Sequence, residues 1–411
     1  MFKIDWVQHA VGHGGFHTGR ARVDAHLEFN WIFDCGAKKT AVFDGFLKTW
    51  TTQNPQPIDW LFVSHFDTDH VSGLDTVMSR AVVRDVMVPY VNERELALQL
   101  LHEIDRGNLD RAFFELVADP ASFFLGRGAD RVTFFRGRRP DGELAADGPR
   151  PERPRDETGW TRKIDPPPRP LPTPRMFRTL PGQGPRVQLM DYETDMAVVH
   201  GPVGLRLKPY RAPITRYAHK GLMKALQALV GAIPWLTHRP GLGDLAFAIA
   251  LYARTATGRA ALRKIFKAHV GSSNRSSLSL LSMPHVQDET ESHWHRPGPT
   301  LAEWGDGVVA WINTGDAELL DAGDLADWEG NYVPMLEKVR VLALPHHGSD
   351  KNSDDALQAL CPEAVLVAHV KAGAAKHPGL DVAAFAGERL ACVTGQAGTE
   401  VRLHFRLPWW E

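Results

Sequence analysis

The stretch Ser64-His65-Phe66-Asp67-Thr68-Asp69-His70 decides how this sequence is expected to fold. Two histidines and two aspartates within it can bind a metal ion, and they follow directly on the apolar run IDWLFVS at residues 58–64. Such a run is typical of a buried strand, and a strand that ends in a loop lets alternate side chains converge on one point. Because imidazole nitrogen and carboxylate oxygen suit Zn²⁺ and Mn²⁺, the stretch predicts a metal site at a strand end.

Three other strand-like runs end in residues of the same kinds. The run at residues 27–33 leads into Asp34. The run Trp311-Ile312-Asn313-Thr314-Gly315-Asp316 ends in a carboxylate behind a glycine, although a Gly-Asp pair alone is more often a turn. The run Ala343-Leu344-Pro345-His346-His347-Gly348-Ser349 ends in two adjacent histidines. Since adjacent side chains point apart, we expect one of these two histidines to reach a metal.

Composition sets the broad class of protein. The 411 residues include 47 Lys/Arg and 49 Asp/Glu, so the formal net charge is −2 and there is no global cationic field for nucleic acid or membranes. No stretch approaches the roughly 20 apolar residues of a membrane-spanning helix, and the N-terminus lacks the form of a signal peptide. Three scattered cysteines do not make a disulfide framework. We therefore expect a soluble, cytoplasmic protein.

Hydrophobic periodicity predicts alternating strands and helices around the motifs. Beyond the runs above, a strand is expected at residues 277–282 and others at 308–316, 339–345 and 364–369. Helices are expected at 93–118, within 217–270, and near 317–326, 353–360 and 380–388. The sequence shows no internal repeat.

A basic, proline-rich segment interrupts this pattern. Residues 138–186 hold 12 of the 29 prolines, a density that argues against packed elements. Residues 127–186 contain 14 Lys/Arg against 8 Asp/Glu. One interpretation is an extended, solvated linker. The other is a mobile arm that contacts phosphates, with Arg136, Arg138 and Arg139 as candidate nucleic-acid-binding residues.

Taken together, the motifs resemble the metallo-β-lactamase superfamily and, within it, the hydrolase domain of ComEC-type competence proteins. That branch has H-x-D-x-D-H, an Asn-x-Ser-Leu strand, T-G-D, P-H-H-G-S and a late G-H-P. In the same order this chain has HFDTDH from His65, NRSSLSL from Asn274, TGD at Asp316, PHHGS at His347, and KHP at His377. The early VGHGG at residues 11–15 resembles that branch's V-G-Q-G-D loop. The chain differs in lacking a transmembrane channel, in having lysine for the late glycine, and in its long middle segment.

The resemblance implies an α/β fold, an αββα sandwich with metals in a cleft at one edge of two packed sheets. Residues 1–94 and 271–411 would form the two halves of this metallo-hydrolase domain. Residues 95–270 would be an insertion of helices, the proline- and arginine-rich linker at about 138–186, and a helical subdomain at about 217–270 that covers the cleft. This insertion takes no function from the resemblance, although it offers a surface for a protein partner.

The resemblance also implies two divalent metal ions, Zn²⁺ or Mn²⁺. Their ligands would be two His and two Asp of the first motif, a bridging Asp and a final His: His65, Asp67, Asp69, His70, Asp316 and His347. His65 and Asp67 would bind one ion. Asp69 and His70 would bind the other. The first ion has no evident third protein ligand, and replacing imidazoles by carboxylates favours Mn²⁺ without excluding Zn²⁺.

The resemblance also implies which residues orient the ligands and which take part in catalysis. His347 is preferred to His346 as the final ligand because the family's final His lies two residues after a strand-ending Pro and before Gly. His346 would then face the substrate. His377 would lie near the leaving group, where it could donate a proton or hold a phosphate oxygen. Asp34 would orient the ligand loop. The catalytic candidates are Asp69, His346 and His377.

Other histidines are expected outside the site. His9, His13 and His17 belong to a glycine-rich loop and could line the cleft, but a solvent-exposed loop is the simpler interpretation. Ser292-His293-Trp294-His295 follows an acidic run and is expected to be an exposed loop. His269 and His285 are not at convincing positions for a ligand.

The leading functional hypothesis is a metal-dependent phosphodiesterase, most plainly a nuclease acting on DNA through a hydroxide activated by two metals. The first alternative is a small-molecule hydrolase of the same fold, acting on a phosphocholine-type ester or a lactone. The second is a metal-binding partner or regulatory subunit without turnover. A β-lactamase is not expected, because the ligand set is rich in carboxylates.

Overall fold

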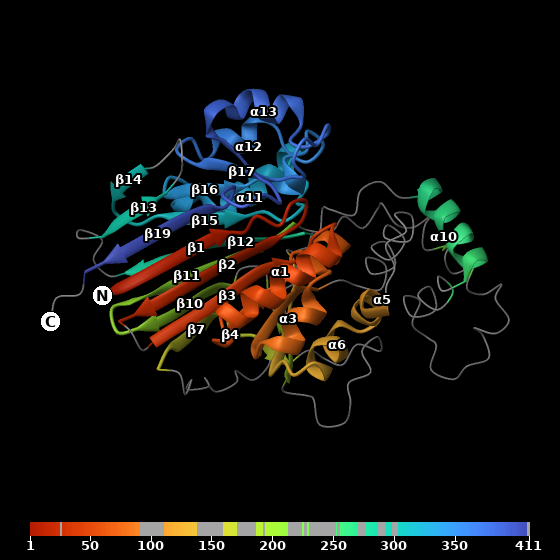
Figure 1. The fold of residues 1–411 in the computed structure, drawn as a ribbon, viewed down its shortest axis with the longest axis horizontal. Coiled ribbons are helices and arrows are strands. Elements are labelled where there is room, and N and C mark those ends of the chain that lie inside the picture. Colours follow the sequence, from red (N-terminus) through yellow and green to blue (C-terminus); the bar gives the residue numbers. More distant parts are fainter. Residues whose placement is uncertain are drawn as a thin grey trace.

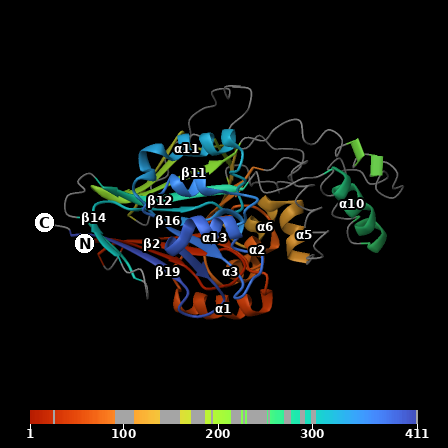
Figure 2. The same ribbon diagram turned by 90° about the horizontal axis from the view of Figure 1, so that it is seen from above.

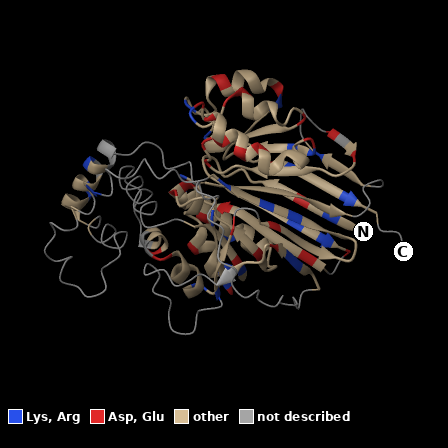
Figure 3. Cartoon of the chain, turned by 180° about the vertical axis from the view of Figure 1, so that it is seen from behind, with Lys and Arg blue, Asp and Glu red and all other residues tan. Residues whose placement is uncertain are grey.

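The structure is a computed structural model, and it describes residues 1–24, 27–90, 111–137, 159–170, 186–191, 194–212, 224–225, 228–229, 252, 255–269, 277–286, 292–297 and 303–408. These residues form two β-sheets packed face to face, with helices on the outer faces (Figures 1 and 2). Acidic and basic residues are interspersed along the helices and strands (Figure 3), in keeping with the small net charge.

The larger sheet, sheet A, has eleven strands in the order β14-β13-β19-β1-β2-β3-β4-β5-β6-β9-β8. Their bounds in that order are Glu303–Asp306, His293–Arg296, Val401–Leu407, Phe2–Gln8, Phe16–Val23, Leu27–Cys35, Ile58–Phe62, Val83–Pro89, Arg131–Phe135, Val187–Met190 and Arg169–Pro170. The strands from β3 to β9 pair in parallel, and the remaining pairs are antiparallel.

The second sheet, sheet B, has eight strands in the order β18-β17-β16-β15-β12-β11-β10-β7. Their bounds in that order are Leu390–Val393, Val365–His369, Val339–Ala343, Ala310–Asn313, Leu278–Val286, Val203–Arg211, Asp195–His200 and Thr161–Asp165. The four strands from β15 to β18 run parallel. Each sheet therefore contains a parallel block, and the carboxyl ends of such strands share one edge.

The helices cover the two outer faces (Figure 2). On the side of sheet A lie α1 (Thr40–Gln53), α2 (Thr68–Val71), α3 (Leu74–Arg80), α5 (Arg111–Ala118) and α6 (Pro120–Gly126). Sheet B is accompanied by α11 (Ala322–Leu336), α12 (Asp355–Ala359) and α13 (Leu380–Ala386), with the short 3-10 helices η3 (Pro345–His347) and η4 (Gly387–Arg389). Helix α10 (Ala256–His269) lies away from the sheets in both views. In the described residues no helix is long and apolar enough to cross a membrane.

The main core fills the space between the sheets. Trp6, Trp31 and Trp60 of sheet A pack in one cluster with Trp311 of sheet B, and each is at most 1% exposed. The indole nitrogen of Trp6 donates a hydrogen bond to Ser282 Oγ across the interface at 2.8 Å. Because removing a buried large aromatic side chain costs about 3–5 kcal/mol, this layer fixes how the sheets face each other, and with them the edge that carries the motifs.

Most predicted strands and helices around the motifs are confirmed. The runs at 27–33, 58–64, 277–282, 308–316, 339–345 and 364–369 form β3, β4, β12, β15, β16 and β17. The helix expected near 317–326 begins only at Ala322, because the Asp321 side chain accepts hydrogen bonds from the backbone of Gly323 and Asp324 and caps the helix there. Cys35, Cys361 and Cys392 are free.

The described strands within residues 95–270 belong to the two sheets rather than to a separate insertion. Strands β6 and β9 extend sheet A, and β7, β10 and β11 extend sheet B. Even the proline-rich segment contributes: Trp160 is 1% exposed in the core, β7 follows it, and Pro170 lies in the edge strand β8, where a missing N–H is tolerated. The sequence did not predict these short strands because prolines are so frequent around them. The rest of the linker, residues 93–110 of the helix expected at 93–118, and most of the subdomain at 217–270 lie outside the described residues.

Candidate metal centre

The two parallel blocks bring four distant segments to one edge of the sandwich. Strand β3 ends at Asp34 and Cys35, and β4 is followed by the motif at 65–70. In sheet B, β15 is followed by Asp316, and β16 by η3 with its two histidines. Since carboxyl ends of parallel strands share an edge, these segments meet there although about 300 residues separate the first from the last.

The first group of potential ligands consists of His65, His70 and Asp316, whose ligand atoms all lie within 4.8 Å of one another. His70 Nε2 is 3.1 Å from Asp316 Oδ1, and His65 Nε2 is 3.5 Å from Asp316 Oδ2. All three residues are buried. The group therefore offers two imidazole nitrogens and one carboxylate.

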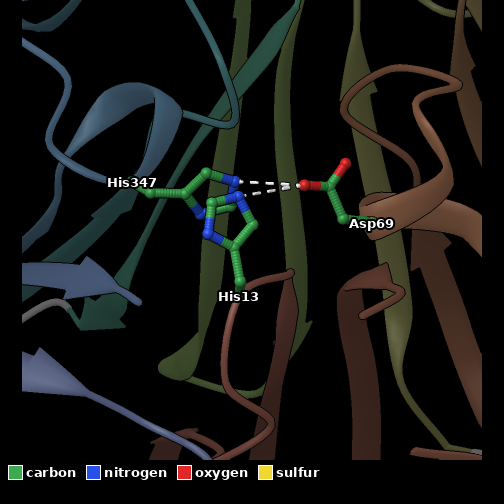
Figure 4. A group of neighbouring side chains, drawn as sticks. All are labelled: His13, Asp69 and His347. Atoms are coloured by element: carbon green, nitrogen blue, oxygen red, sulfur yellow. Dashed lines mark ion pairs between the residues drawn. The ribbon is translucent and has the colours of Figure 1, made fainter. Parts of the chain in front are cut away.

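The second group consists of His13, Asp69 and His347 (Figure 4). The two imidazoles lie beside each other, with ring centroids 3.9 Å apart, and both point toward the carboxylate. His13 Nε2 and His347 Nε2 are each 3.4 Å from Asp69 Oδ2. This group is adjacent to the first, because the His347 ring lies 5.7 Å from the ring of His70.

A hydrogen-bonded chain through Asp34 orients the first group. Asp34 Oδ1 accepts the backbone N–H of Ser64 at 2.6 Å, and Oδ2 accepts both Ser64 Oγ–H and His70 Nδ1–H at 2.7 Å. Since Ser64 Oγ donates to Asp34, it accepts Nδ1–H of His65 at 2.8 Å. Both imidazoles then carry the proton on Nδ1, which leaves the Nε2 lone pair for a metal.

These residues fit a divalent cation. Nε2 of His65, of His70 and of His347 is buried, and no hydrogen bond satisfies it in the part of the chain that the structure describes. Buried polar atoms are rarely left without a partner, and a cation would satisfy all three. Each group combines two imidazoles with one carboxylate, a set that suits Zn²⁺ as well as Mn²⁺. The preference for Mn²⁺ based on the sequence therefore loses its basis.

Electrostatics keep both carboxylates anionic. Burial would raise the pKa of Asp69, but the neighbouring imidazoles of His13 and His347 outweigh it and hold this pKa well below its usual value. Burial likewise opposes ionisation of Asp316, and the charges of His70 and its neighbours outweigh it. For His70, burial disfavours the cation, but the carboxylates of Asp316 and Asp34 raise its pKa well above the usual value.

Two predicted residues lie beside the groups. Asp67 Oδ2 is 3.8 Å from His65 Nε2, and Asp67 is fully buried. His346 Nε2 is 3.8 Å from Asp316 Oδ2, while its Nδ1–H donates to Asn352 Oδ1 at 2.7 Å. Both adjacent histidines reach the site because the backbone is left-handed at His346 (φ 47°) and His347 (φ 61°). Such backbone angles cost roughly 1–3 kcal/mol each in non-glycine residues and cluster at functional sites.

The rim of the site contains His377 and Lys38. The His377 ring lies 5.6 Å from that of His346 and 5.7 Å from that of His13. Burial, aided by the charges of His346 and His13, lowers the pKa of His377 to about 4, so its ring is neutral at neutral pH. Lys38 Nζ lies 3.6 Å from Asp69 Oδ2 and its side chain is 48% exposed.

The pairing of the ligands differs from the prediction. His70 lies with His65 rather than with Asp69, so it would supply the third ligand that the first ion lacked. Asp316 lies in the first group, and a bridge from it to the second ion stays a prediction. His285 belongs to neither group, and the side chain of His269 lies outside the part of the chain that the structure describes.

His13 is the ligand candidate that sequence reasoning assigned to solvent. Gly15 N–H donates to Asp69 O at 3.0 Å, which lays the glycine-rich loop on the ligand motif. A Cβ at Gly14 would lie 2.3 Å from Gly36 O, so only glycine allows this approach. The signal available in the sequence was the likeness of VGHGG to the family's early loop. His369, at the end of β17, also lines the cavity at the site.

The other histidine-containing segments that we expected to be exposed loops are ordered. His17 is 1% exposed in β2, and His9 packs against Phe16 with ring centroids 4.9 Å apart. Residues 293–296 form β13, an edge hairpin with β14, in which His293 Nδ1 bonds Asp306 Oδ1 at 2.6 Å. The predicted loop was wrong because Trp294 packs into the core and orders the segment.

The candidate basic arm is only partly described. Arg136 follows β6, and its guanidinium is 2.5 Å from Asp191 Oδ1, with the side chain 15% exposed. It is therefore held in an ion pair rather than extended into solvent. Arg138 and Arg139 lie outside the described residues, as do the terminal Trp409 and Trp410.

The motif of His and Asp ligands behind β4 lies inside a region that a family model recognises. Residues 32–123 match the metallo-β-lactamase superfamily. The mixed α/β sandwich agrees with the fold of that superfamily, which implies a metal-dependent hydrolase. The match does not extend to the narrower likeness to ComEC-type proteins.

The other comparisons add little. Among solved structures, the metallo-β-lactamase MIM-1 from Novosphingobium pentaromativorans aligns over 92% of this chain and 85% of that chain, with 11% identity and a TM-score of 0.25. A likeness of that size supports no argument about fold or function. No curated protein sequence matches the chain.

Proposed function

We propose that this protein is a metal-dependent phosphodiesterase and that its substrate is DNA, in line with the ComEC-like order of its motifs. The observation that carries the proposal is the rim of the site, where Lys38 and His377 present N–H groups beside the two groups of ligands. A phosphodiester carries a negative charge on oxygens that accept such hydrogen bonds. A lactone carries no charge and would make less use of the Lys38 ammonium.

The residues that would hold two divalent cations are His65, His70 and Asp316 on one side, and His13, Asp69 and His347 on the other. Bound there, the cations would supply Lewis acidity to a phosphoryl oxygen and lower the pKa of a water molecule. Zn²⁺ and Mn²⁺ are both candidates.

The neighbouring side chains have distinct roles in this proposal. Because His346 donates its Nδ1–H to Asn352, its Nε2 is a proton acceptor directed at the site. His377 is neutral at neutral pH, so it holds a phosphate oxygen through N–H rather than acting as a ready source of a proton. Lys38 attracts the anionic substrate and lies close to His13, with which it makes a hydrogen bond.

The test compares substrates of different charge. The purified protein, supplied with Zn²⁺ or Mn²⁺, is assayed on DNA, bis(p-nitrophenyl) phosphate, a phosphocholine ester and a lactone. We expect hydrolysis of DNA and bis(p-nitrophenyl) phosphate, and a higher KM for both substrates in the Lys38→Ala variant. Lys39→Ala is the matched control, because Lys39 is exposed next to it and forms no ion pair in the described residues.

Two results would contradict the proposal. Turnover of the lactone or phosphocholine ester alone would make the protein a small-molecule hydrolase. Bound metal without turnover of any substrate would favour a partner or regulatory subunit.

A further inference from the structure

A groove outside the metal centre lies on the outer face of sheet A, between α1 and the strands β19, β1 and β2. Its volume is about 600 Å³, within the usual range of ligand-binding pockets. The residues of β1 alternate between buried and half-buried, so Ile4 and Trp6 enter the core while Asp5 and Val7 face the groove. Helix α1 forms the wall in front of these strands (Figure 1).

Two arginines line the groove without an ion-pair partner among the described residues. Arg20 donates from Nε to Asn30 Oδ1 at 3.1 Å and from Nη2 to Asn54 Oδ1 at 2.9 Å, which are both neutral partners. Arg402 is exposed at the end of the groove toward the metal edge. Among the described residues, no carboxylate forms an ion pair with either guanidinium, so both charges are available to an anionic ligand.

The other ionisable groups of the groove include two carboxylates, those of Asp5 and Glu400. Asp5 accepts hydrogen bonds from Arg22 Nη2 at 2.5 Å and from His404 Nδ1 at 2.6 Å. Burial and the neighbouring charge of Arg402 lower the pKa of His9 to about 3. The three arginines, Arg20, Arg22 and Arg402, outnumber the two acids by one, so the groove has a small positive charge although the whole chain has a net charge of −2.

The wall of the groove is partly aromatic. Phe46 and Trp50 lie four residues apart on one face of α1, and both are half-buried. The Trp50 ring is fixed by an edge contact with Phe16 at 5.2 Å between centroids. Gln53 completes this face and offers amide hydrogen bonds. Proteins that bind single-stranded nucleic acid combine cationic side chains with aromatic rings in one groove. The phosphates contact the charges, and the bases stack on the rings.

The groove also leads toward the metal centre. Val7 and His9 line it, and the loop that follows them carries His13, a member of the second ligand group. One loop thus connects the groove to the site.

We propose that this groove binds a single strand of nucleic acid. The phosphates of the strand contact Arg20 and Arg402. Its bases stack on Phe46 and Trp50. The choice of a polynucleotide rests on the proposed function, because a strand held here supplies its neighbouring phosphodiesters to the metal edge.

The test measures binding separately from cleavage. Anisotropy of a labelled single-stranded oligonucleotide with phosphorothioate linkages is followed against salt concentration for the full chain. Arg20→Gln combined with Arg402→Gln should reduce the steepness of log K against log salt by about 1.4, at about 0.7 for each lost phosphate contact. Arg402→Gln alone should reduce it by about 0.7, and this exposed residue can change without affecting the fold.

Aromatic contacts are tested by Trp50→Leu, which should weaken binding at least about fivefold while leaving the salt dependence unchanged. The matched control removes two cations from the opposite sheet, by Lys163→Gln combined with Arg206→Gln. It should bind like the parent. Hydrolysis of bis(p-nitrophenyl) phosphate should be unchanged in every variant, because none lies at the metal groups.

Several outcomes would overturn the proposal. These are an unchanged salt dependence in the double arginine variant, an equal loss in the control, or a mononucleotide that binds as tightly as the oligonucleotide. Absence of hydrolysis by the parent would refute the proposed function, but it would leave the binding comparison intact.

Discussion

Replacing Asp34 by Asn should cost metal affinity by changing which nitrogen of His70 carries the proton. Asp34 Oδ2 accepts Nδ1–H of His70 at 2.7 Å, and Oδ1 accepts the N–H of Ser64 at 2.6 Å. Asparagine has the same shape and can still accept from Ser64. Its amide N–H₂ would then face Nδ1 of His70, which must become an acceptor, so Nε2 would be protonated and lost as a ligand.

Removing a hydrogen bond that orients a metal ligand typically lowers metal affinity by about 10- to 100-fold, or about 1.4–2.7 kcal/mol. We expect a loss of this size in Asp34→Asn. Competition with a chromophoric chelator measures the two dissociation constants. We expect the weaker binding to be confined to one ion, because the second group does not depend on Asp34.

Asp59→Asn is the matched control. Asp59 is also a buried carboxylate, at 3% exposure, and accepts a backbone N–H from Asn30 at 2.9 Å, but it is not part of the site. Unchanged affinity in Asp34→Asn, or an equal loss in Asp59→Asn, would refute the tautomer argument.

Further substitutions and pH separate the remaining roles. Asp316→Ala should abolish activity and most bound metal if this carboxylate bridges two ions, and elemental analysis showing an unchanged metal content would exclude that role. His347→Ala should lower metal occupancy, whereas His346→Ala should spare metal and reduce turnover; the reverse pattern in paired assays would exchange the two assignments. The carboxylates of Asp316 and Asp34 outweigh the effect of burial and raise the pKa of His70. A metal ion that binds this imidazole must therefore displace a proton from it. Calorimetry in buffers of different ionisation enthalpy should therefore show proton release at neutral pH, with affinity that falls as the pH falls, and binding without proton release would argue against His70 as a ligand.

The sandwich and its active edge follow from local sequence signals. Apolar runs such as residues 58–64 and 339–345 are continuous because their strands are buried on both faces, and polar residues directly after them mark the shared edge. Asp34 and Asp316 could be placed there for that reason. Strand β7 could not, since its five residues TRKID have no apolar run and lie among prolines.

The composition of each ligand group depends on packing that the sequence does not encode locally. The family resemblance of the motif at 65–70 implied that His70 would accompany Asp69. In the structure, α2 begins at Thr68, and its turn directs His70 toward His65 and Asp316 instead. His13 reaches the site only because glycines let its loop lie against the motif. Such approaches between distant backbones leave at most a glycine pattern in the sequence.

We expect one edge of this sandwich to hold two divalent metals in adjacent groups, His65 with His70 and Asp316, and His13 with Asp69 and His347. Anomalous diffraction at the manganese and zinc absorption edges, from crystals grown with each metal, tests it directly. We expect two anomalous peaks, one within each group of ligands and about 3.5–4 Å apart. A single peak, or metal bound only elsewhere on the chain, would contradict it.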